Sequence, residues 1–405
     1  MDRRSSHKHH DRRPCHAPLS AWAWTFLVAF TLAACGVRDT AVAGAPVYNV
    51  PVMVVTHLYV ATTGRDTNTG TDTAPFATIG RAALAATPGT IVHVAPGMYE
   101  GGIKTLISGS ITPGGRIVYV SSERWGAKIV PPGDPARGTS ASAWDNRGNY
   151  VDIVGFEIDG SRHQGGIKWT TGIYSGGSYD TIRENHVHHI ATDVRCTSAG
   201  GSGIGVDSYY HGINSDVIGN SVHDIGTAGC QFIQGIYVNT PGTVRNNIVY
   251  RVAEAGIHLW HDATNVVIVN NTVTTSNTGI VVGGGDFYYT KGPNDHTDVY
   301  NNIVFDNHMG IFEEGATGKN NRYRNNLVFQ NKGGDWRLLN GLEAQETVAE
   351  APAFLAYTRT GTPDFRLAAH SPAIGKGLAR MAGAVDAGGK ARTAQGGVDL
   401  GALQH

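Results

Sequence analysis

The sequence lacks an excess of positive charge, a long hydrophobic run and a helical repeat, and each absence excludes a class of protein. Lysine and arginine number 32 against 33 aspartates and glutamates, and no basic stripe stands out, so nucleic acid is not an expected partner. The apolar run from Ala21 to Ala34 is too short for a comfortable membrane span. The apolar segments of the middle are short and rich in Val, Ile and Gly, without the 3.6-residue spacing of helical repeats.

The N-terminus has the pattern of a secretory signal, with a basic head before the apolar run and small residues at its end. The run ends in Leu32-Ala33-Ala34-Cys35, which resembles a bacterial lipobox. We therefore predict a signal peptide with a lipobox over residues 1–35 and a tether over 36–56. The resemblance implies lipidation of Cys35, and Gly36 after it favours the outer membrane. Ordinary secretory cleavage is the alternative, and both predict export to the periplasm, the outer membrane or the exterior.

Two short motifs recur through the middle of the chain. Gly-Ile pairs and Asn-containing β-branched triplets alternate, and successive repeat asparagines are 35, 27, 24, 31 and 24 residues apart. A period near 24 built from short strands predicts a solenoid of parallel strands over residues 57–340. Alternation places the isoleucines in one interior row, comprising Ile173, Ile204, Ile236, Ile257, Ile280 and Ile311. Stacked asparagines at the turns predict an amide ladder, comprising Asn185, Asn220, Asn247, Asn271, Asn302 and Asn326.

Cysteine is scarce, with 4 in the chain. Cys196 and Cys230 each fall 10 or 11 residues after a repeat asparagine, on adjacent coils. Their similar registers predict one disulfide in an oxidising compartment, and a pair of free buried thiols is the alternative.

The two ends of the repeat region resemble secreted right-handed parallel β-helix proteins of the pectate-lyase-like superfamily. Leu58-Tyr59-Val60-Ala61, a helix-forming stretch from Ala77 to Ala86 and the strand from Ile91 to Val94 resemble their opening coil. Residues 341–405 resemble their closing segment. The resemblance implies an all-β fold, a single-stranded right-handed parallel β-helix with a short N-terminal capping helix. Such proteins mostly act on polysaccharides, as lyases, hydrolases or mannuronan epimerases.

Two rows of side chains point outward from the Gly-Ile strands if the isoleucines point inward. The first row is Tyr174, Gly205, Tyr237, His258, Val281 and Phe312, and the second is Gly176, Asp207, Asn239, Trp260, Gly283 and Glu314. Long aromatic loops, Ser208 to Asp216 and Gly284 to Thr297, leave the same side and would wall a trough. Such a trough suits sugar rings, and a covering loop is the alternative use of the rows.

The row residues favour β-elimination on a uronate-containing polysaccharide. Tyr237 and His258 should lie about 5 Å apart on adjacent coils, and this pair beside an amide resembles the Tyr/His class of alginate lyases. We predict His258 as the base and Tyr237 as the acid, with Asn239 holding the uronate carboxylate. The expected substrate-binding residues are Trp260, Asp207, Lys168, Lys291, Tyr288 and Glu314, with Lys168, Lys291 or Arg195 supplying positive charge.

Other activities stay open. Trp260-His261-Asp262 resembles part of the Asp-Pro-His-Asp motif of mannuronan epimerases, which makes His261 the rival base. Asp207 and Glu314 lie four coils, or about 19 Å, apart, too far for a glycosidase pair, although a loop carboxylate such as Asp286 leaves a hydrolase possible. Glycan binding without catalysis is a further alternative.

We predict no cofactor and assign no metal ligands. Calcium has weak support, because only Asp207 stands out where a cation site needs several clustered oxygens. His188 and His223, with Asp224, form a further histidine cluster, interpreted as surface or turn structure, with a metal site as the alternative.

Overall fold

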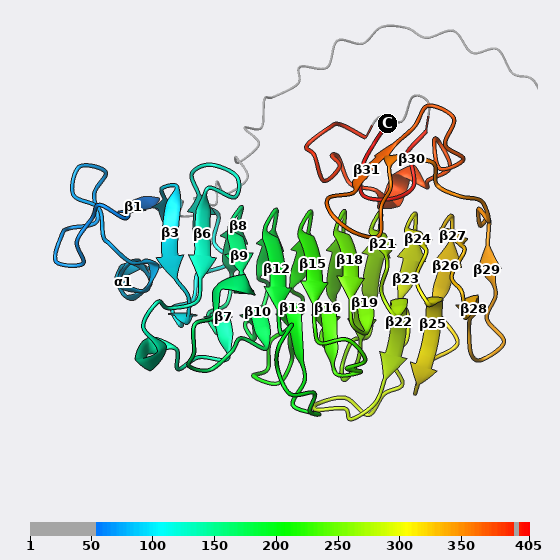
Figure 1. The fold of residues 1–405 in the computed structure, drawn as a ribbon, viewed down its shortest axis with the longest axis horizontal. Helices are drawn as coiled ribbons and strands as arrows, with labels where there is room; N and C mark the ends of the chain where they lie inside the picture. The colour runs from blue at the N-terminus through cyan, green and yellow to red at the C-terminus, as the bar shows by residue number, and fades with distance from the viewer. Residues whose placement is uncertain (1–53, 393–396) are drawn as a thin grey trace, which may run out of the picture. The chain divides into compact units, whose positions relative to one another are not determined.

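Three parallel sheets wrap around one core in the computed structural model, which describes residues 54–392 and 397–405 (Figure 1). The predicted signal peptide and Cys35 lie outside these residues. The 11-stranded sheet, here sheet A, contains β1 (Thr56–Val60), β2 (Thr90–Val94), β5 (Ile117–Ser121), β8 (Val151–Val154), β11 (Thr181–Arg183), β14 (Asp216–Ile218), β17 (Gly242–Arg245), β20 (Val266–Val269), β23 (Asp298–Tyr300), β26 (Arg322–Arg324) and β29 (Ala344–Gln345).

The other two sheets have nine strands each and follow sheet A in each coil from β2 to β28, sheet B first and sheet C second. Sheet B contains β3 (Gly97–Glu100), β6 (Ala127–Val130), β9 (Glu157–Asp159), β12 (His186–Ile190), β15 (Ser221–Ile225), β18 (Ile248–Val252), β21 (Thr272–Thr274), β24 (Ile303–Phe305) and β27 (Leu327–Phe329). Sheet C contains β4 (Ile103–Thr105), β7 (Ser142–Asn146), β10 (Thr171–Ser175), β13 (Gly201–Val206), β16 (Ile233–Val238), β19 (Ala255–Leu259), β22 (Thr278–Gly284), β25 (Met309–Gly315) and β28 (Gly334–Arg337).

This topology confirms the predicted right-handed parallel β-helix. The connection between successive strands of a sheet is one full coil, and parallel crossovers are right-handed in nearly all proteins. Solenoid strands run from Thr56 to Gln345, compared with the predicted range of 57–340. Within the described residues, no helix is long and apolar enough to cross a membrane.

The predicted isoleucine row is confirmed. Ile173 pairs with Ile204, and the pairing continues in register through Ile236, Ile257, Ile280 and Ile311, all fully buried. Because the register of sheet C sets which side chains face outward, both outward rows lie where alternation placed them: Tyr237 pairs with His258, and Gly283 with Glu314.

The predicted asparagine ladder is also confirmed at the turn from sheet A to sheet B. Each side-chain amide donates to the Oδ1 of the next asparagine, as Asn247 does to Asn271 at 3.0 Å, and each Nδ2 also reaches a backbone carbonyl of the preceding strand. The residue before each ladder asparagine has a positive φ, for example 58° at Asn246. That left-handed residue makes the sharp turn, and the ladder satisfies the polar groups that the turn buries.

The N-terminal helix α1 (Ile79–Ala85) packs against β1 and β4, within the stretch predicted to cap the first coil. The Thr78 hydroxyl accepts a hydrogen bond from Arg81 N, and Asp66 Oδ1 accepts from the backbone of Ala77 and Thr78. These acceptors satisfy amides at the helix start that have no partner within the helix. Ile79 turns inward onto the core.

The C-terminal segment lies along the side of the solenoid (Figure 1). Its antiparallel hairpin, β30 (Phe354–Ala356) and β31 (Asp364–Leu367), packs against sheet B, where Leu367 meets Ile303. Further on, Asn270 Nδ2 donates to the backbone oxygen of Asp399. Three short 3-10 helices complete the described elements: Pro135–Arg137, Gly160–Arg162 and Ala379–Met381.

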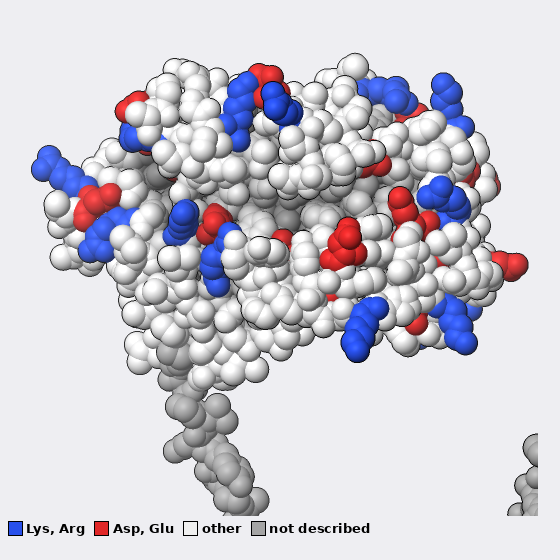
Figure 2. Space-filling model, turned by 90° about the horizontal axis from the view of Figure 1, so that it is seen from below, with Lys and Arg blue, Asp and Glu red and all other residues white. Residues whose placement is uncertain are grey.

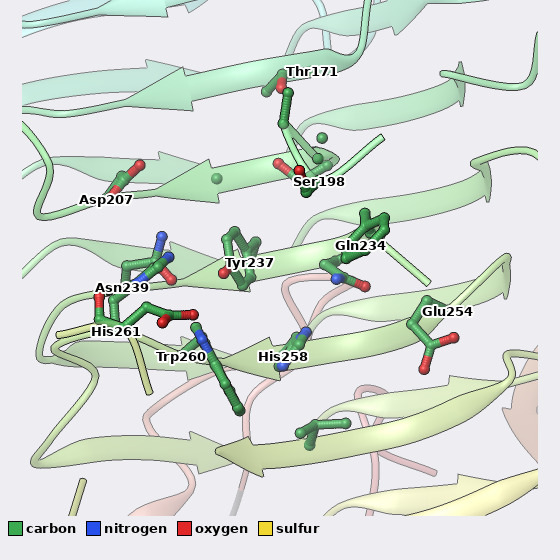
Figure 3. Close-up of a pocket in the computed structure, with 18 of the residues that line it drawn as sticks. Thr171, Ser198, Asp207, Gln234, Tyr237, Asn239, Glu254, His258, Trp260 and His261 are labelled. Carbon is green, nitrogen blue, oxygen red and sulfur yellow. Dashed lines mark hydrogen bonds between the residues drawn. The ribbon is translucent and has the colours of Figure 1, made fainter. Parts of the chain in front are cut away.

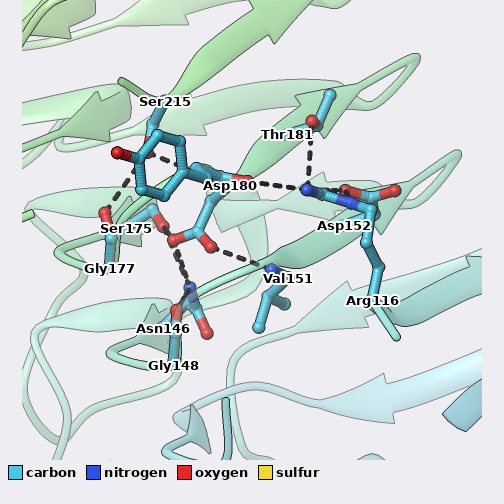
Figure 4. A network of polar contacts seen from close by, with 11 residues as sticks. Arg116, Asn146, Gly148, Val151, Asp152, Ser175, Gly177, Asp180, Thr181 and Ser215 are labelled. Atoms are coloured by element: carbon cyan, nitrogen blue, oxygen red, sulfur yellow. Dashed lines mark hydrogen bonds and ion pairs between the residues drawn. The ribbon is translucent and has the colours of Figure 1, made fainter. Parts of the chain in front are cut away.

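A buried polar network joins the turns between sheets C and A (Figure 4). Asp180 accepts hydrogen bonds from Asn146 Nδ2 at 2.8 Å, Ser175 Oγ at 2.7 Å and Val151 N at 2.9 Å. Beside it, Arg116 pairs with Asp152. Burial raises the pKa of Asp180 to about 7, although these donors oppose the shift.

Candidate functional site

A cleft of about 620 Å³ runs over the outer face of sheet C, from β10 to β25. Its floor is formed by the two outward rows, and loops that contain Ser198, Phe232 and Tyr288 add to its lining. The face in Figure 2 is hollowed along its length, and acidic side chains lie beside the hollow. The structure therefore places the predicted trough where the strand register required it.

Tyr237 and His258 lie side by side on this floor, on β16 and β19 (Figure 3). Their ring centroids are 5.3 Å apart, and the ring of Trp260 lies 5.7 Å from that of His258. His258 is partly exposed, but both of its ring nitrogens are buried and neither has a hydrogen-bond partner. The Oδ1 atom of Asn239, on the same floor, is also buried and unpartnered.

Unpartnered buried polar atoms are unusual, and each costs about 1–3 kcal/mol. They line the cleft rather than the core, so a bound ligand is the natural partner for them. Burial, and to a lesser extent the nearby His261, lowers the pKa of His258 to about 3, so the imidazole is neutral at ordinary pH. Burial also raises the pKa of Tyr237, which keeps its hydroxyl protonated. The pair thus offers one neutral base and one proton donor.

His261 is held in one tautomer. Its Nδ1 lies 2.8 Å from the backbone oxygen of Asp286, which can only accept, so Nδ1 carries the proton. In the neutral imidazole Nε2 then accepts from the Tyr288 hydroxyl at 2.8 Å, and the two rings stack with centroids 4.0 Å apart. The Tyr237 ring lies 6.2 Å from His261, between the two histidines. The cleft therefore contains two Tyr/His pairs.

Asp262 anchors the loops that wall the cleft. Its carboxylate accepts from Ser208 Oγ at 3.0 Å, from Thr290 Oγ1 at 2.8 Å and from the backbone of Tyr289. Tyr289 in turn donates its hydroxyl to the backbone oxygen of Tyr209 at 2.8 Å. These bonds tie the two predicted long loops to one another.

Trp260 lies across glycines of the next coil. A Cβ atom at Gly283 or Gly285 would come within 2.6 Å of the indole ring, so any larger residue there would displace it. The indole therefore rests on backbone and stays half-exposed in the cleft. A flat aromatic face held in this way is a suitable stacking platform for a sugar ring.

The charge of the cleft is negative. Asp207, Glu254, Asp286 and Glu314 line it, whereas none of the described lining residues is a lysine or arginine. The predicted basic residues lie elsewhere: Lys168 pairs with Asp193, and Lys291 and Arg195 are exposed outside the lining. The structure thus brings together His258, Tyr237, His261, Asn239, Trp260, Asp207, Tyr288 and Glu314, but neither Lys168 nor Lys291.

Positive charge occurs on the same sheet over the N-terminal coils. A second hollow of about 380 Å³ is lined by Lys104, Arg137 and Arg147 together with Asp145. Arg147 is held by Asp145 and by the rings of Tyr174 and Tyr210, whose centroids lie 4.6 and 3.5 Å from its guanidinium carbon. Three coils separate β7 from β16, so this hollow lies about 14 Å from the Tyr237 row.

Gln234 and Glu254 are lining residues that sequence patterns did not identify. Strict alternation from Ile236 places Gln234 inside, but it faces the cleft (Figure 3). The reason is Gly235, where a Cβ would meet Val249 Cγ1 of the core at 2.8 Å. Two successive residues, Gly235 and Ile236, therefore face inward, and the alternation shifts by one. Glu254 precedes β19 in a turn, where alternation gives no direction.

The cleft contains no obvious cation site. Among the described residues, groups of three or more His, Cys, Asp or Glu ligand atoms within 4.8 Å of one another occur only on sheet B, at Glu157, His186 and His188, and at Asp159, His188 and His189.

Cys196 and Cys230 form the predicted disulfide, with a Cα–Cα distance of 5.4 Å. It joins two loops whose neighbouring residues, Ser198 and Gln231, line the cleft.

These features define a right-handed parallel β-helix with a cleft on one sheet, and comparisons with known proteins agree on the fold. A pectate lyase structure is similar with a TM-score of 0.55 and 16% identity over 87% of this chain and 97% of that one. A rhamnogalacturonan lyase (TM-score 0.50, 15% identity, 78% and 95%) and a glycoside hydrolase (TM-score 0.50, 9%, 69% and 89%) are also similar. A family model described as a protein of unknown function (DUF1565) matches residues 62–107, which include α1 and the first coil. No curated protein sequence matches the chain.

Proposed function

We propose that the chain is an exported enzyme that cleaves a uronate-containing polysaccharide by β-elimination, with His258 as the base and Tyr237 as the acid. The observation that carries the proposal is the set of unpartnered polar atoms on the cleft floor, His258 Nδ1, His258 Nε2 and Asn239 Oδ1. A stable fold gains nothing from them, whereas a reaction that moves a proton requires a free lone pair at this place.

In the proposed reaction, His258 removes the proton alpha to the uronate carboxylate. The electron pair forms the new carbon–carbon double bond, and the bond to the glycosidic oxygen breaks. Tyr237 donates its proton to that leaving oxygen, and proton exchange with water resets both side chains. Amide groups of Asn239 and Gln234 flank Tyr237 and support the carboxylate, while Trp260 stacks on a neighbouring sugar (Figure 3).

Substrate binding also adjusts the base. The pKa of His258 is low because its imidazolium would be desolvated and would repel His261. A uronate carboxylate above the ring stabilises the charged form and raises that pKa toward the working pH. Since both ring nitrogens of His258 are buried, the substrate has to shift a neighbouring ring, such as that of Tyr237 or Trp260, before proton transfer.

The basic hollow supports an acidic polymer as substrate. A chain lying along sheet C with one sugar at His258 would present anionic sugars to Lys104, Arg137 and Arg147 further along, because β7 lies four coils, or about 19 Å, from β19. This separation of positive charge from the reacting sugar differs from the sequence prediction, in which Lys168 or Lys291 served the reacting uronate itself.

Export through a lipid anchor at Cys35 to the outer membrane belongs to the same proposal. The disulfide between Cys196 and Cys230 supports it, because such bonds persist in oxidising compartments outside the cytosol. Acidic polysaccharides occur there as substrates.

Two further activities have specific support. The His261–Tyr288 pair is also a base and an acid, and it suits epimerisation, in which one group removes the proton and the other adds a proton to the same carbon from the other face. The second activity is glycoside hydrolysis. Burial and the negative charge of Glu314 raise the pKa of Glu254, although Asn277 donates a hydrogen bond to its carboxylate. A carboxyl group with a raised pKa in an acidic cleft suits the general acid of a glycoside hydrolase.

A panel of acidic and neutral polysaccharides tests these proposals together. A lyase generates an unsaturated uronate that absorbs in the ultraviolet, and we expect this signal with an acidic polymer. New reducing ends without absorbance would replace the lyase with the hydrolase, and deuterium uptake from solvent without cleavage would indicate the epimerase. Binding without any of these products would leave a glycan-binding protein.

A further inference from the structure

A histidine and carboxylate cluster covers three adjacent coils of sheet B, on a different sheet from the cleft. The strand register pairs His186 with Glu157, and it pairs His188 with both Asp159 and His223. All of these side chains lie on the outer face of β9, β12 and β15. Asp159, His188 and His223 are buried there, and the Trp125 ring lies 4.7 Å from that of His186.

The ligand atoms of this cluster converge. Glu157, His186 and His188 each offer one atom within 4.8 Å of the others. His188 Nε2 lies 3.3 Å from Glu157 Oε1, and His186 Nε2 lies 2.7 Å from His223 Nε2. Ligand atoms of a tetrahedral zinc site lie about 3.3 Å apart, because each is bonded at about 2.0–2.1 Å. The Glu157–His188 spacing is thus that of a zinc site, whereas the His186 and His223 nitrogens are closer together and have to move apart when an ion binds.

The second polar atoms of Glu157, His188 and His223 have partners that orient them. Glu157 Oε2 pairs with Lys128 at 2.8 Å, which leaves Oε1 directed at the histidines. His188 Nδ1 lies 2.8 Å from His189 Nδ1, and His223 Nδ1 lies 2.6 Å from Asp224 Oδ2. In metal sites a coordinating histidine typically engages its other ring nitrogen in this way.

We propose that Glu157, His186 and His188 bind one divalent transition-metal cation of the Zn²⁺ type, and that His223, whose Nε2 lies outside this group but 2.7 Å from His186 Nε2, moves in as the fourth ligand. Three imidazole nitrogens and one carboxylate oxygen match the ligands that zinc accepts, whereas calcium and magnesium prefer oxygen alone. The ion joins β9, β12 and β15, so its direct effect is to hold three coils together. This site is independent of the proposed lyase reaction.

A hydrogen-bonded histidine cluster without an ion is the competing explanation. The chain offers a matched control for it on sheet A, where His57 Nδ1 and His93 Nε2 lie 2.9 Å apart with stacked rings. That pair belongs to no group of potential ligands among the described residues. A general affinity of paired histidines for metal would therefore appear at both places.

Calorimetric titration of the metal-free, untagged full chain with ZnCl₂ tests the proposal. We expect one tight Zn²⁺ per chain that His188→Gln weakens at least about 10-fold and His93→Gln leaves unchanged. Co²⁺ should give the visible absorption of a tetrahedral site, and Zn²⁺ should raise the melting temperature of the wild type but not of His188→Gln. N-terminal histidines such as His7 and His9 are the same in all variants, so any Zn²⁺ that they bind does not change the comparison between variants.

Glu157→Gln is the second variant. This substitution keeps the size of the side chain and its contact with His188 while it removes a charged ligand. The proposal can therefore be tested with Glu157→Gln even if His188→Gln fails to fold. Equal Zn²⁺ affinity in the wild type and both variants, or equal loss in His93→Gln, would overturn the proposal.

Discussion

At the scale of single residues, the imidazole of His258 lowers the stability of the folded chain. Both ring nitrogens are buried without partners, so replacing the imidazole with an apolar side chain of similar volume removes that cost. We predict that His258→Leu raises the free energy of unfolding by about 1–3 kcal/mol while it abolishes catalysis. Chemical denaturation measures the first effect. A loss of stability of similar size would instead show that His258 is a structural residue.

Asp180 predicts a pH-dependent stability. Its pKa is about 7 in the folded chain, chiefly through burial, and about 3.9 when unfolded. Between these values the folded state holds the extra proton, so the stabilisation is complete below about pH 4 and is lost as the pH rises through about 7. We expect a decrease of up to about 4 kcal/mol across this window, absent in Asp180→Asn. The same slope in both proteins, measured by denaturation at both ends of the window, would contradict this assignment.

The direction of a cleft side chain could be predicted from the sequence only within a regular strand, where inward and outward residues alternate. Tyr237 and His258 follow directly from the isoleucine row, because period-two alternation holds between Ile236 and Val238. Gln234 could not be predicted, since Gly235 shifts the alternation just before it. His261 lies beyond its strand with φ of 47°, and only its contacts with the Asp286 and Tyr288 loop fix its direction.

At the scale of elements, the asparagine ladder predicts a position-specific cost. Asn271 Oδ1 accepts from Asn247 N at 2.9 Å and Asn247 Nδ2 at 3.0 Å, so Asn271→Ala leaves the buried Asn247 N unpaired and removes one of the two hydrogen bonds of Asn247 Nδ2. We expect a loss of about 3 kcal/mol or more in the free energy of unfolding. The control Asn265→Gly, at an exposed turn with φ of 55°, should stay within about 0.5 kcal/mol. Equal effects of the two substitutions would argue against the ladder as a stabilising element.

The repeating strands and turns were predictable because each coil is built from the same local sequence pattern. A glycine that allows close approach to the core, an isoleucine that fills it and an asparagine that closes the turn recur at similar spacing. The position of residues 341–405 could not be predicted, since they contact residues that are distant in the sequence. Asn246 and Asn270, for example, donate to Val385 and Asp399 across the side of the solenoid.

At the scale of the whole molecule, the parallel sheets separate the activities proposed for it. Sheet C bears the cleft, the outer face of sheet B bears the histidine cluster, and the C-terminal segment packs beside that cluster, where Tyr250 meets Phe365. The two sites face outward from different sheets, so a substitution of an outward side chain on one sheet should leave the other site unchanged. Loss of Zn²⁺ in His188→Gln should therefore not alter turnover in the cleft.

The localisation proposal is also tested on the whole chain. We predict that the protein expressed in a Gram-negative bacterium begins at Cys35 and carries lipid, and that it fractionates with the outer membrane. Cys35→Ser should move it to the soluble periplasmic fraction without changing its activity, because residues 36–56 are predicted as a tether. Mass spectrometry of the mature N-terminus checks this, and an intact N-terminus upstream of Cys35 would contradict it.

The central claim is that His258 in the sheet C cleft removes the proton that makes β-elimination possible. The most direct measurement is the rate of unsaturated-product formation on a polysaccharide that the wild type cleaves, compared between His258→Asn and Glu254→Gln. The account predicts that His258→Asn loses about 100-fold or more in rate, the usual contribution of a general base, while Glu254→Gln retains most of its activity. Full activity of His258→Asn, or a saturated product that disappears in Glu254→Gln, would contradict it.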